Sequence, residues 1–416
     1  MFVLYEVALG LVFLVTLPFF ILAGFLRGKY LTNFPARMGF YRTRLDSHDL
    51  WLHAVSVGEV LASQSVVAEI TRMRPGTSLV VTTTTITGQA QARRLYSDAT
   101  VTYFPFDFSF SVKRFLDHHR PRVFATMETE IWPNAARISQ SRGIRMVLAN
   151  GRISDRSFPR YRALRMVVGP VLRMYDRILV REKTDRERML AIGAPAEIVE
   201  TTGNVKFDYK PDHSALAMAP LLERLIAGRK VFVLGSTMEG EDEELLPELE
   251  RFVRERDAFV IIAPRKPERF EAVAGLLGTT SLRFVRRSEL SAAAPSAEVL
   301  LVDTFGELAR IYRYATAAFI GGTLAQFGGH NPIEAAAAGV PIAFGPHMSN
   351  FREIAAAFLG HGAEEVRSAA EVIGFAERMF DDENLRRERG EQARQTVEAS
   401  RGASERTARA IVELLT

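Results

Sequence analysis

The chain has 416 residues, a length that ordinarily forms two domains rather than one core. Its 47% hydrophobic and 25% charged residues are typical of a globular protein and exclude a largely disordered chain. The lack of cysteine excludes disulfides, thiolate metal sites and a cysteine nucleophile, and the eight histidines show no metal-binding spacing, so we expect neither a metal nor a cofactor.

The first 28 residues predict a membrane anchor. Residues 7–26 carry no charge, and a run of this length can cross a hydrocarbon core of about 30 Å. Glu6 precedes the run, and the basic residues that follow it are Arg27, Lys29, Arg37, Arg42 and Arg44. The positive-inside rule then places the body on the cytoplasmic side of a single-pass anchor. A monotopic hairpin or a buried helix is the alternative.

Residues 29–208 predict a first α/β domain, because short apolar runs alternate with helical patterns. The expected strands are 50–55, 78–83, 101–105, 122–127, 145–149, 177–181 and 198–202. Helices are expected between them, at 59–73, 87–96, 109–119 and 132–141 among others. The pattern is typical of a doubly wound parallel sheet.

A second α/β series follows a linker region over 209–228, whose first part is Tyr209–His213. Its apolar runs are KVFVLGS, AFVIIAP, LRFVRR, VLLVD, AAFIGG and VPIAFG, and they define a second domain over 229–385. We expect a helix over 386–416 to pack back on the first domain. Two Rossmann-like domains of this kind enclose a cleft, and ligands bind beyond the carboxyl ends of the strands.

Basic residues concentrate between Arg137 and Arg188, where thirteen arginines and one lysine face five acids, a local balance of +9. Such a block suits a polyanion, either a nucleic acid, an anionic membrane or a phosphorylated lipid. The alternative is a set of solvated helix faces.

Four motifs of the first domain place polar residues where strands end. WLHAVSVGEV puts Glu59 after a strand, where it is either a partner of a helix dipole or an exposed base. METEIWPN supplies Glu130, and GNVKFD supplies Lys206. NGRISDRS supplies Arg152 and Arg156. Their convergence predicts an active site.

Three segments of the second domain suggest a nucleotide site. Gly235-Ser236-Thr237 precedes an expected helix start and could offer N–H groups to an anion, although Ser and Thr are also common helix caps. Pro264-Arg265 follows the next strand. The segment FIGGTLAQFGGHNPIEAAAAG has two glycine pairs, Asn331 as the expected N-cap and Pro332 as the first helical residue, with Glu334 placed to accept from ribose hydroxyls.

These motifs, in this order behind an anchor, resemble the 3-deoxy-D-manno-octulosonic acid (Kdo) transferases of lipopolysaccharide synthesis. The resemblance rests on HAVSVGE, METEIWPN, NGRISDRS, GNVKFD, APRKPERF and GGHNPIEAAAAG and covers nearly the whole chain. It implies a GT-B fold and an inverting transfer of Kdo from CMP-Kdo to a lipid A precursor at the cytoplasmic face of the inner membrane. It also implies that the transfer step itself needs no metal.

The resemblance also implies residue roles. Glu59 resembles the general base, and Glu130 and Lys206 resemble groups that support the transition state. The CMP site would comprise Ser236, Thr237, Pro264, Arg265, Phe305, Gly306, Glu307, Asn331, Pro332, Ile333 and Glu334. Acceptor contacts would come from Ser56, Gly58, Arg152 and Arg156. Anionic lipid headgroups, but no nucleic acid, are expected partners.

Two other readings remain open. Another GT-B enzyme, such as a heptosyltransferase or a UDP-sugar 2-epimerase, would share the architecture. A non-catalytic, membrane-tethered scaffold that binds sugar nucleotides would share the site but not the activity.

Overall fold

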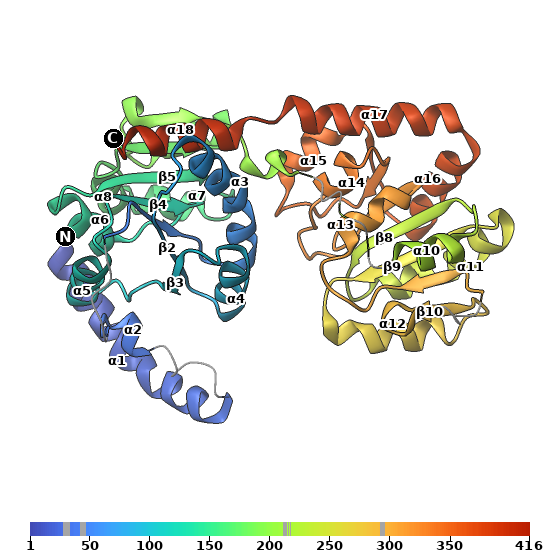
Figure 1. Cartoon of the computed structure of the whole chain (residues 1–416), viewed down its shortest axis with the longest axis horizontal. Helices are drawn as coiled ribbons and strands as arrows, with labels where there is room; N and C mark the ends of the chain where they lie inside the picture. The colour runs from blue at the N-terminus through green and yellow to red at the C-terminus, as the bar shows by residue number, and fades with distance from the viewer. Residues whose placement is uncertain (28–33, 42–46, 211–213, 215, 217, 292–295) are drawn as a thin grey trace. The chain divides into compact units, whose positions relative to one another are not determined.

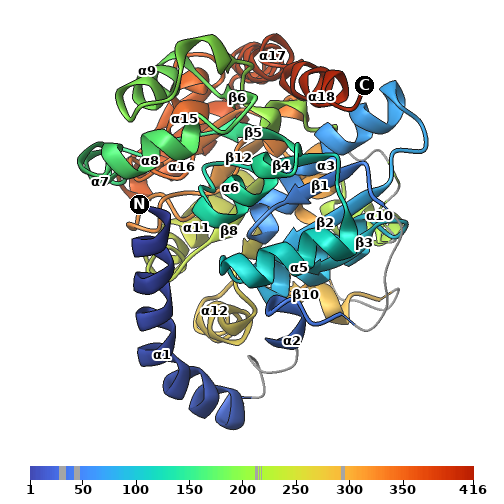
Figure 2. The same ribbon diagram turned by 90° about the vertical axis from the view of Figure 1, so that its left-hand side faces the viewer.

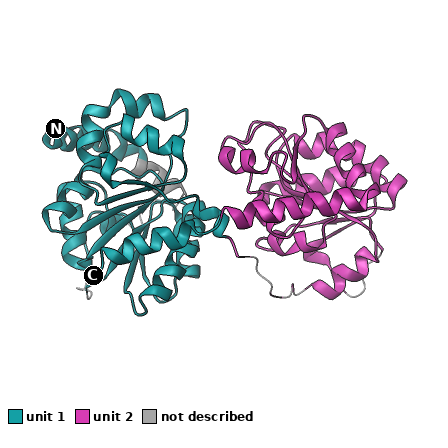
Figure 3. Cartoon of the chain, turned by 90° about the horizontal axis from the view of Figure 1, so that it is seen from above, with its two compact units in different colours: residues 1–208, 401–416 teal, residues 209–400 magenta. Residues whose placement is uncertain are grey.

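The computed structural model describes residues 1–27, 34–41, 47–210, 214, 216, 218–291 and 296–416. It forms two compact units, one of Met1–Asp208 with Arg401–Thr416 and the other of Tyr209–Ser400 (Figure 3). Lys29, Arg42 and Arg44, invoked for the anchor's orientation, and residues 211–213 of the expected linker lie outside the described residues.

Unit 1 contains a seven-stranded sheet among its described residues, and every pairing in it is parallel. In spatial order the strands are β3 (Thr100–Tyr103), β2 (Leu79–Thr83), β1 (Leu50–His53), β4 (Val123–Met127), β5 (Arg145–Gly151), β6 (Arg177–Val180) and β7 (Val199–Thr201). Central strands such as β1 and β4 are buried at every residue, which explains their continuous apolar runs. The chain order reverses between β1 and β4, so a switch point lies there.

Helices cover both faces of this sheet (Figure 1). The helical elements of unit 1 are α1 (Phe2–Arg27), α2 (Phe34–Arg37), α3 (Val57–Met73), α4 (Ile86–Leu95), α5 (Ser109–His119), α6 (Pro133–Ser141), α7 (Phe158–Ala163), α8 (Arg165–Leu172), α9 (Lys183–Ala191), η1 (Ala196–Ile198), η2 (Val205–Asp208) and α18 (Ala403–Glu413). On one face α5, α6 and α8 pack around Trp51, which stacks on Phe124 at 3.7 Å between ring centroids. On the other face α3, α4 and α18 bury Leu52 and Val66. The two cores fix the strand ends at which the polar motifs lie.

Unit 2 repeats this design with a second seven-stranded parallel sheet in the described part of the chain. Its strands are β10 (Phe284–Arg286), β11 (Val299–Leu301), β9 (Phe259–Pro264), β8 (Val231–Thr237), β12 (Ala317–Ile320), β13 (Ile342–Phe344) and β14 (Ala363–Glu365). Its helical elements are α10 (Ala219–Ile226), α11 (Glu241–Arg256), η3 (Pro267–Arg269), α12 (Phe270–Leu277), η4 (Arg287–Glu289), α13 (Leu308–Ile311), η5 (Tyr312–Tyr314), α14 (Ile333–Ala337), α15 (Arg352–Phe358), α16 (Ala369–Asp381) and α17 (Glu383–Ala399). The switch point lies between β8 and β12. The sequence patterns missed β14, since its three residues include two glutamates.

The C-terminal segment forms two helices rather than one, because α17 ends at Ala399 and α18 begins at Ala403. The start of α18 is held by Asp208, whose carboxylate accepts from Gly402 N and Ser404 N, both at 2.6 Å. α18 contacts α3 within unit 1. Asp208, the last residue of the GNVKFD motif, therefore caps a helix that begins almost two hundred residues later in the chain.

The N-terminal helix α1 is apolar enough and long enough to cross a membrane. Its stretch Phe2–Phe19 has a mean hydropathy of 2.1. The helix begins at Phe2, before the uncharged run of residues 7–26.

Candidate active site

Glu59 lies in the first turn of α3, directly after β1 and beside the switch point of unit 1. It is half-buried rather than exposed, and its carboxylate accepts from Val55 N at 2.7 Å and from Ser56 Oγ at 3.2 Å. Burial and the negative charge of Glu128 raise the pKa of Glu59 to about 8, against the opposing effect of the Val55 N–H. A carboxyl group with this pKa can exchange a proton near neutral pH.

Glu128 is the residue around which this site is organised, and the sequence motifs did not single it out. It follows β4 and pairs with Arg181 (Oε1–Nη2 2.5 Å) and Lys206 (Oε1–Nζ 3.5 Å). Burial alone would raise the pKa of Glu128, but the charges of Arg181, Lys206 and Arg152 hold it below its usual value. Glu128 therefore stays ionised beside a carboxyl group, Glu59, that is mostly protonated at neutral pH.

The backbone is strained at this edge of the sheet. Glu128 has a φ of +59° and Asn150, near the end of β5, has a φ of +56°. Residues other than glycine rarely adopt this conformation, and such residues gather at functional sites. Asn150 Oδ1 accepts from Val205 N at 3.2 Å, and Asn204 Oδ1 accepts from Lys206 N at 3.1 Å. These two amides fix η2 and aim Lys206 at Glu128.

Glu130 also belongs to this carboxylate group. Burial raises its pKa to about 7, the neighbouring Trp132 side chain opposes that shift, and the charge of Glu128 raises the pKa further. Glu130 contributes in the same direction to the raised pKa of Glu59. The carboxyl groups of Glu59, Glu128 and Glu130 are thus electrostatically coupled, and Glu128 carries most of the negative charge at neutral pH.

The expected acceptor residues of unit 1 differ in their placement. Gly58 is exposed, and a Cβ built there would meet no atom nearer than Ser56 Oγ at 3.9 Å, so open space lies beside Glu59. Arg152 is half-buried, and its backbone N donates to Thr129 Oγ1 at 2.9 Å. Arg156 is exposed in the turn before α7. Their contacts with a substrate remain predictions.

In unit 2 the segment Gly235-Ser236-Thr237 belongs to β8 and not to a helix start. α11 begins at Glu241, so the expectation that this segment forms a turn at a helix start is wrong. Contacts of Ser236 and Thr237 with CMP stay predictions. Ser236 has a φ of +61°, a third strained residue at a strand end. A Cβ at Gly235 would lie 2.1 Å from Tyr312 Oη, so glycine is required there by packing.

The first glycine pair after β12, Gly321 and Gly322, allows close packing of the backbone and donates a hydrogen bond to the carboxylate of Glu241. Glu241 is buried and accepts from the backbone N–H groups of Gly322, Thr323 and Leu324 at 2.6, 2.8 and 2.9 Å. A Cβ at Gly321 would lie 2.6 Å from Ser236 O. The expectation that this pair lets backbone approach a ligand is therefore wrong for these N–H groups, because Glu241 already satisfies them.

The Asn331–Glu334 segment combines polar groups with a short helix. α14 begins at Ile333 with Pro332 as its cap residue, one position later than expected, because Asn331 Oδ1 accepts from Ile333 N at 3.2 Å. Glu334 accepts from Asn331 Nδ2 at 3.5 Å, and burial raises its pKa while Asn331 and Arg265 oppose that shift. Burial and the charges of Arg265 and Lys266 lower the pKa of His330 to about 4. The ends of β9 and β12 therefore share one electrostatic environment.

Four expected CMP residues have buried side chains: Thr237, Pro264, Pro332 and Ile333. Their contacts with a ligand stay predictions. Phe305 is 62% exposed, and Gly306 has a φ of +82°. Glu307 is engaged by Arg287, which donates to its carboxylate at 2.9 Å.

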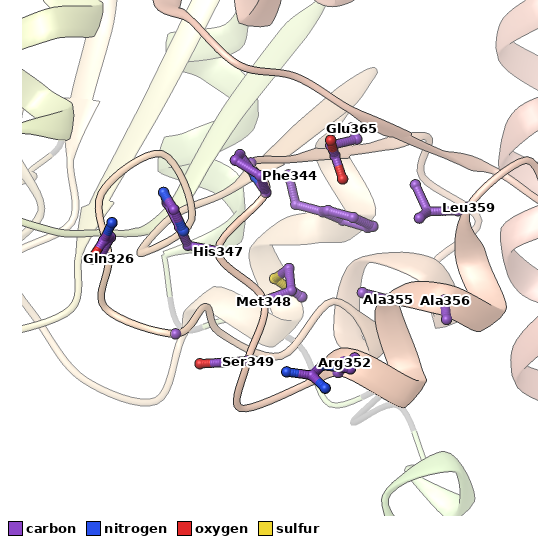
Figure 4. Close-up of a pocket in the computed structure, with 13 residues that line it drawn as sticks. Gln326, Phe344, His347, Met348, Ser349, Arg352, Ala355, Ala356, Leu359 and Glu365 are labelled. Atoms are coloured by element: carbon purple, nitrogen blue, oxygen red, sulfur yellow. The ribbon is translucent and has the colours of Figure 1, made fainter. Parts of the chain in front are cut away.

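A cavity of about 530 Å³ opens near the second glycine pair (Figure 4). The loops after β12 and β13 and the helix α15 line it, with Gln326, His347, Ser349, Arg352 and Glu365 as its polar side chains. None of the residues expected for the CMP site lines this cavity. Its volume falls in the range of small-molecule sites.

Comparisons with known proteins decide the family. A family model described as 3-Deoxy-D-manno-octulosonic-acid transferase (kdotransferase) matches residues 32–209. The 3-deoxy-D-manno-octulosonic acid transferase of Bordetella pertussis is 33% identical over 93% of this chain and 93% of its own length. That of Haemophilus influenzae is 32% identical over 91% of this chain and 90% of its own. The chain belongs to the Kdo transferase family.

Family membership confirms the resemblance read from the motifs and makes the chain a glycosyltransferase. A solved structure titled as a putative UDP-N-acetylglucosamine 2-epimerase of Listeria monocytogenes has a TM-score of 0.60, 14% identity, and coverage of 88% of this chain and 95% of its own. That likeness shows the fold alone. Two parallel α/β units of the GT-B type are thereby confirmed.

The sequence motifs of this Kdo transferase family member did not indicate the roles of two residues, Glu128 and Glu241. The METE segment offered two acids, and the strained backbone that distinguishes Glu128 cannot be read from residue types. Glu241 lies 81 to 83 positions from the N–H groups it binds. An acid in the first turn of a helix is ordinarily a cap, which hid its structural role.

Proposed function

We propose that the chain transfers Kdo from CMP-Kdo to a phosphorylated lipid A precursor, with inversion, at the cytoplasmic face of the inner membrane. Unit 1 would supply the base and the acceptor contacts, and unit 2 the donor contacts. The substrates are those that family membership suggests.

The observation that carries this proposal is the electrostatic effect of Glu128 on Glu59. A transfer to a hydroxyl group needs a base that takes up the proton, and Glu59 has a raised pKa and open space at Gly58 beside it. Glu128 stays ionised through Arg181 and Lys206, and its charge makes Glu59 more basic. Lys206, held at Glu128, would support the transition state.

Unit 2 offers cations and hydrogen-bonding groups suited to an anionic nucleotide sugar. Arg265 and Lys266 are exposed after β9, and Arg265 interacts electrostatically with Glu334 and His330. Arg265 would neutralise the single phosphate of the CMP leaving group without a divalent ion. The nearby cavity, with Arg352 and His347, would receive the carboxylate-bearing sugar.

The basic block of unit 1 is divided between internal pairs and an exposed group. Arg145 and Arg188 pair with Asp176 and Asp155. At the junction of α7 and α8, Arg160, Arg162 and Arg165 are exposed together with Leu164, Met166 and Val167. This mixture of arginine and apolar side chains suits the headgroups and acyl chains of an anionic bilayer.

The test is mass spectrometry of the lipid formed by the purified chain from CMP-Kdo and a lipid A precursor. A product heavier by one or more Kdo residues is expected. A parallel incubation with UDP-GlcNAc and no lipid tests the hypothesis that the chain is an epimerase. Epimerisation of UDP-GlcNAc, together with no transfer of Kdo to the lipid, would refute the proposal.

A further inference from the structure

The helix α1 is docked on unit 1 through buried polar contacts at its start. Glu6 accepts from Ser109 N at 3.0 Å, from Ser109 Oγ at 2.8 Å and from Asn134 Nδ2 at 2.6 Å. The hydroxyl of Tyr5 donates to Asp107 Oδ2 at 2.9 Å. Asn134 and Asp107 are almost fully buried, so these are contacts within the body and not at its rim.

Glu6 caps the start of α5, because the residue at the N-cap position of that helix makes no capping bond of its own. α5 starts after Phe108 and α6 after Trp132, and neither residue makes a side-chain capping bond. The carboxylate of Glu6 meets the first N–H group of α5, at Ser109, and Asp107 accepts from Asn134 N and Ala135 N at the start of α6. Carboxylates at such positions stabilise helices. Two helices of the unit 1 core therefore begin on a network that includes α1.

The contact with the body continues along the helix. Half-buried positions recur with helical spacing, at Phe2, Tyr5, Glu6, Leu9, Gly10, Phe13, Thr16 and Leu17. Phe13 packs edge-on against Phe106 and Phe108, with ring centroids at 5.6 and 5.3 Å. Phe34, in α2 after the helix, lies 6.1 Å from Phe13. This stripe spans about 22 Å of helix axis at 1.5 Å per residue.

The opposite face of α1 is apolar and open. Its large residues are between 56% and 79% exposed and are Val3, Leu4, Val7, Leu11, Val12, Leu14, Val15 and Phe19. An uncharged surface of this extent is typical of contact with lipid. Figures 1 and 2 both show the start of α1 beside α6 and α8, the latter carrying the exposed arginine and apolar group described above. The adjacent cations favour an anionic bilayer as the occupant of this face.

A membrane-spanning helix is incompatible with these contacts. If residue 2 and residue 27 lay on opposite sides of a bilayer, Glu6 would be separated by the hydrocarbon core of about 30 Å from Ser109 and Asn134. The start of α5 and the buried amide of Asn134 would then lose their partner. Phe34 would also have to leave Phe13.

We infer that α1 lies along unit 1 with its open face in one leaflet, so that both ends of the helix remain on the side of the body. The anchor is then a monotopic part of the catalytic unit that holds the start of α5 and α6 at the lipid surface. This inference does not depend on which sugar is transferred.

The cysteine-free chain permits a direct test with introduced thiols. Arg137 lies over the ring of Phe2, with Cζ 5.2 Å from its centroid, so the double variant Phe2→Cys/Arg137→Cys should be joined within one chain by a short bis-maleimide in inner-membrane vesicles. Peptide mass spectrometry identifies the product, and the two single variants are the controls. An active double variant whose two thiols react singly but never join would overturn the inference.

Sidedness and lipid contact provide independent readouts. A membrane-impermeant maleimide should label Phe2→Cys from the same side as Ser97→Cys, which reports the exposed body; labelling from opposite sides would refute the docked topology. A fluorophore on Val15→Cys should be quenched by brominated lipid in vesicles of phosphatidylethanolamine and phosphatidylglycerol, whereas one on Ser97→Cys should not. A disulfide-linked dimer of Val15→Cys without quenching would assign the open face to a second copy and overturn the lipid assignment.

Discussion

Replacing Glu59 by Gln removes the candidate base while retaining an oxygen that can accept from Val55 N or from Ser56 Oγ. General-base assistance contributes about 10²–10⁴-fold to a rate, which corresponds to about 2.7–5.5 kcal/mol in the activation barrier. We expect kcat for Kdo transfer to fall by this factor. Binding of CMP, measured by calorimetry, should stay within about twofold, because the substitution leaves unit 2 unchanged.

The wild-type rate should depend on pH through the same carboxyl group. With a pKa of about 8, roughly a tenth of the molecules carry an ionised Glu59 at pH 7. The kcat/KM of the wild type should therefore rise about tenfold per pH unit below 8 and level off above it. The Glu59→Gln variant should lack this step.

The free energy of unfolding should change with pH in the direction opposite to the rate, so that it falls as pH rises. The folded pKa of Glu59 is raised above the unfolded value near 4.5, so its contribution is fully present below pH 4.5 and is lost as pH rises through 8. Since water reaches part of this side chain, we expect Glu59→Gln to gain about 1–3 kcal/mol over the wild type between pH 5 and pH 9, measured by denaturant unfolding.

The matched control is Glu69→Gln on the same helix, where the acid pairs with Arg72 at the surface. It should leave the rate and its pH dependence unchanged. The assignment of Glu59 as base would be refuted by a Glu59→Gln variant within tenfold of wild-type activity. A wild-type pH profile without a step near 8 would refute the electrostatic reasoning.

Three further substitutions test other parts of the structure. Gly58→Ala should not destabilise the fold, because its Cβ meets no atom nearer than 3.9 Å and alanine favours a helix by about 1 kcal/mol, but kcat should fall at least about tenfold if the acceptor occupies that space. Glu128→Gln should lower the unfolding free energy by about 1–3 kcal/mol and shift the midpoint of the pH–rate profile below 8, since the charge that raises the pKa of the base is gone. Gly235→Ala should cost about 3 kcal/mol in a urea melt, because the methyl group would overlap the buried Tyr312 hydroxyl, whereas Gly275→Ala, which has nothing within 4 Å, should not destabilise.

The sequence predicts the sheets well because their strands are buried on both faces. Runs such as VFATM at 123–127 are apolar except for Thr126 and are buried at every residue, which is typical of a parallel strand. The same reasoning failed at Ala363–Glu365, an edge strand too short and too polar to show the pattern. Strand prediction thus succeeds where packing demands apolar residues and fails at the sheet edge.

The position of the candidate site could be predicted from the sequence, but the roles of its individual residues could not. Because parallel strands end at one edge, Glu59, Glu130 and Lys206 could be grouped from their motifs alone. Which acid stays charged depends on Arg181 and Lys206 meeting Glu128, and these contacts join residues 53 and 78 positions apart. The docking of Glu6 at Ser109 and Asn134 is equally non-local, so the hydropathy of α1 suggested a spanning helix.

The return of α18 to unit 1 has a consequence for biosynthesis. The helix that carries Glu59 packs against α18, and Asp208 can cap α18 only once Gly402 and Ser404, almost two hundred residues further along the chain, have been synthesised. Unit 2 is contiguous and can fold as soon as it has been synthesised, whereas unit 1 is complete only after residues 401–416 have followed it. A frameshift that alters residues 401–416 would therefore damage the unit that contains residues 1–208.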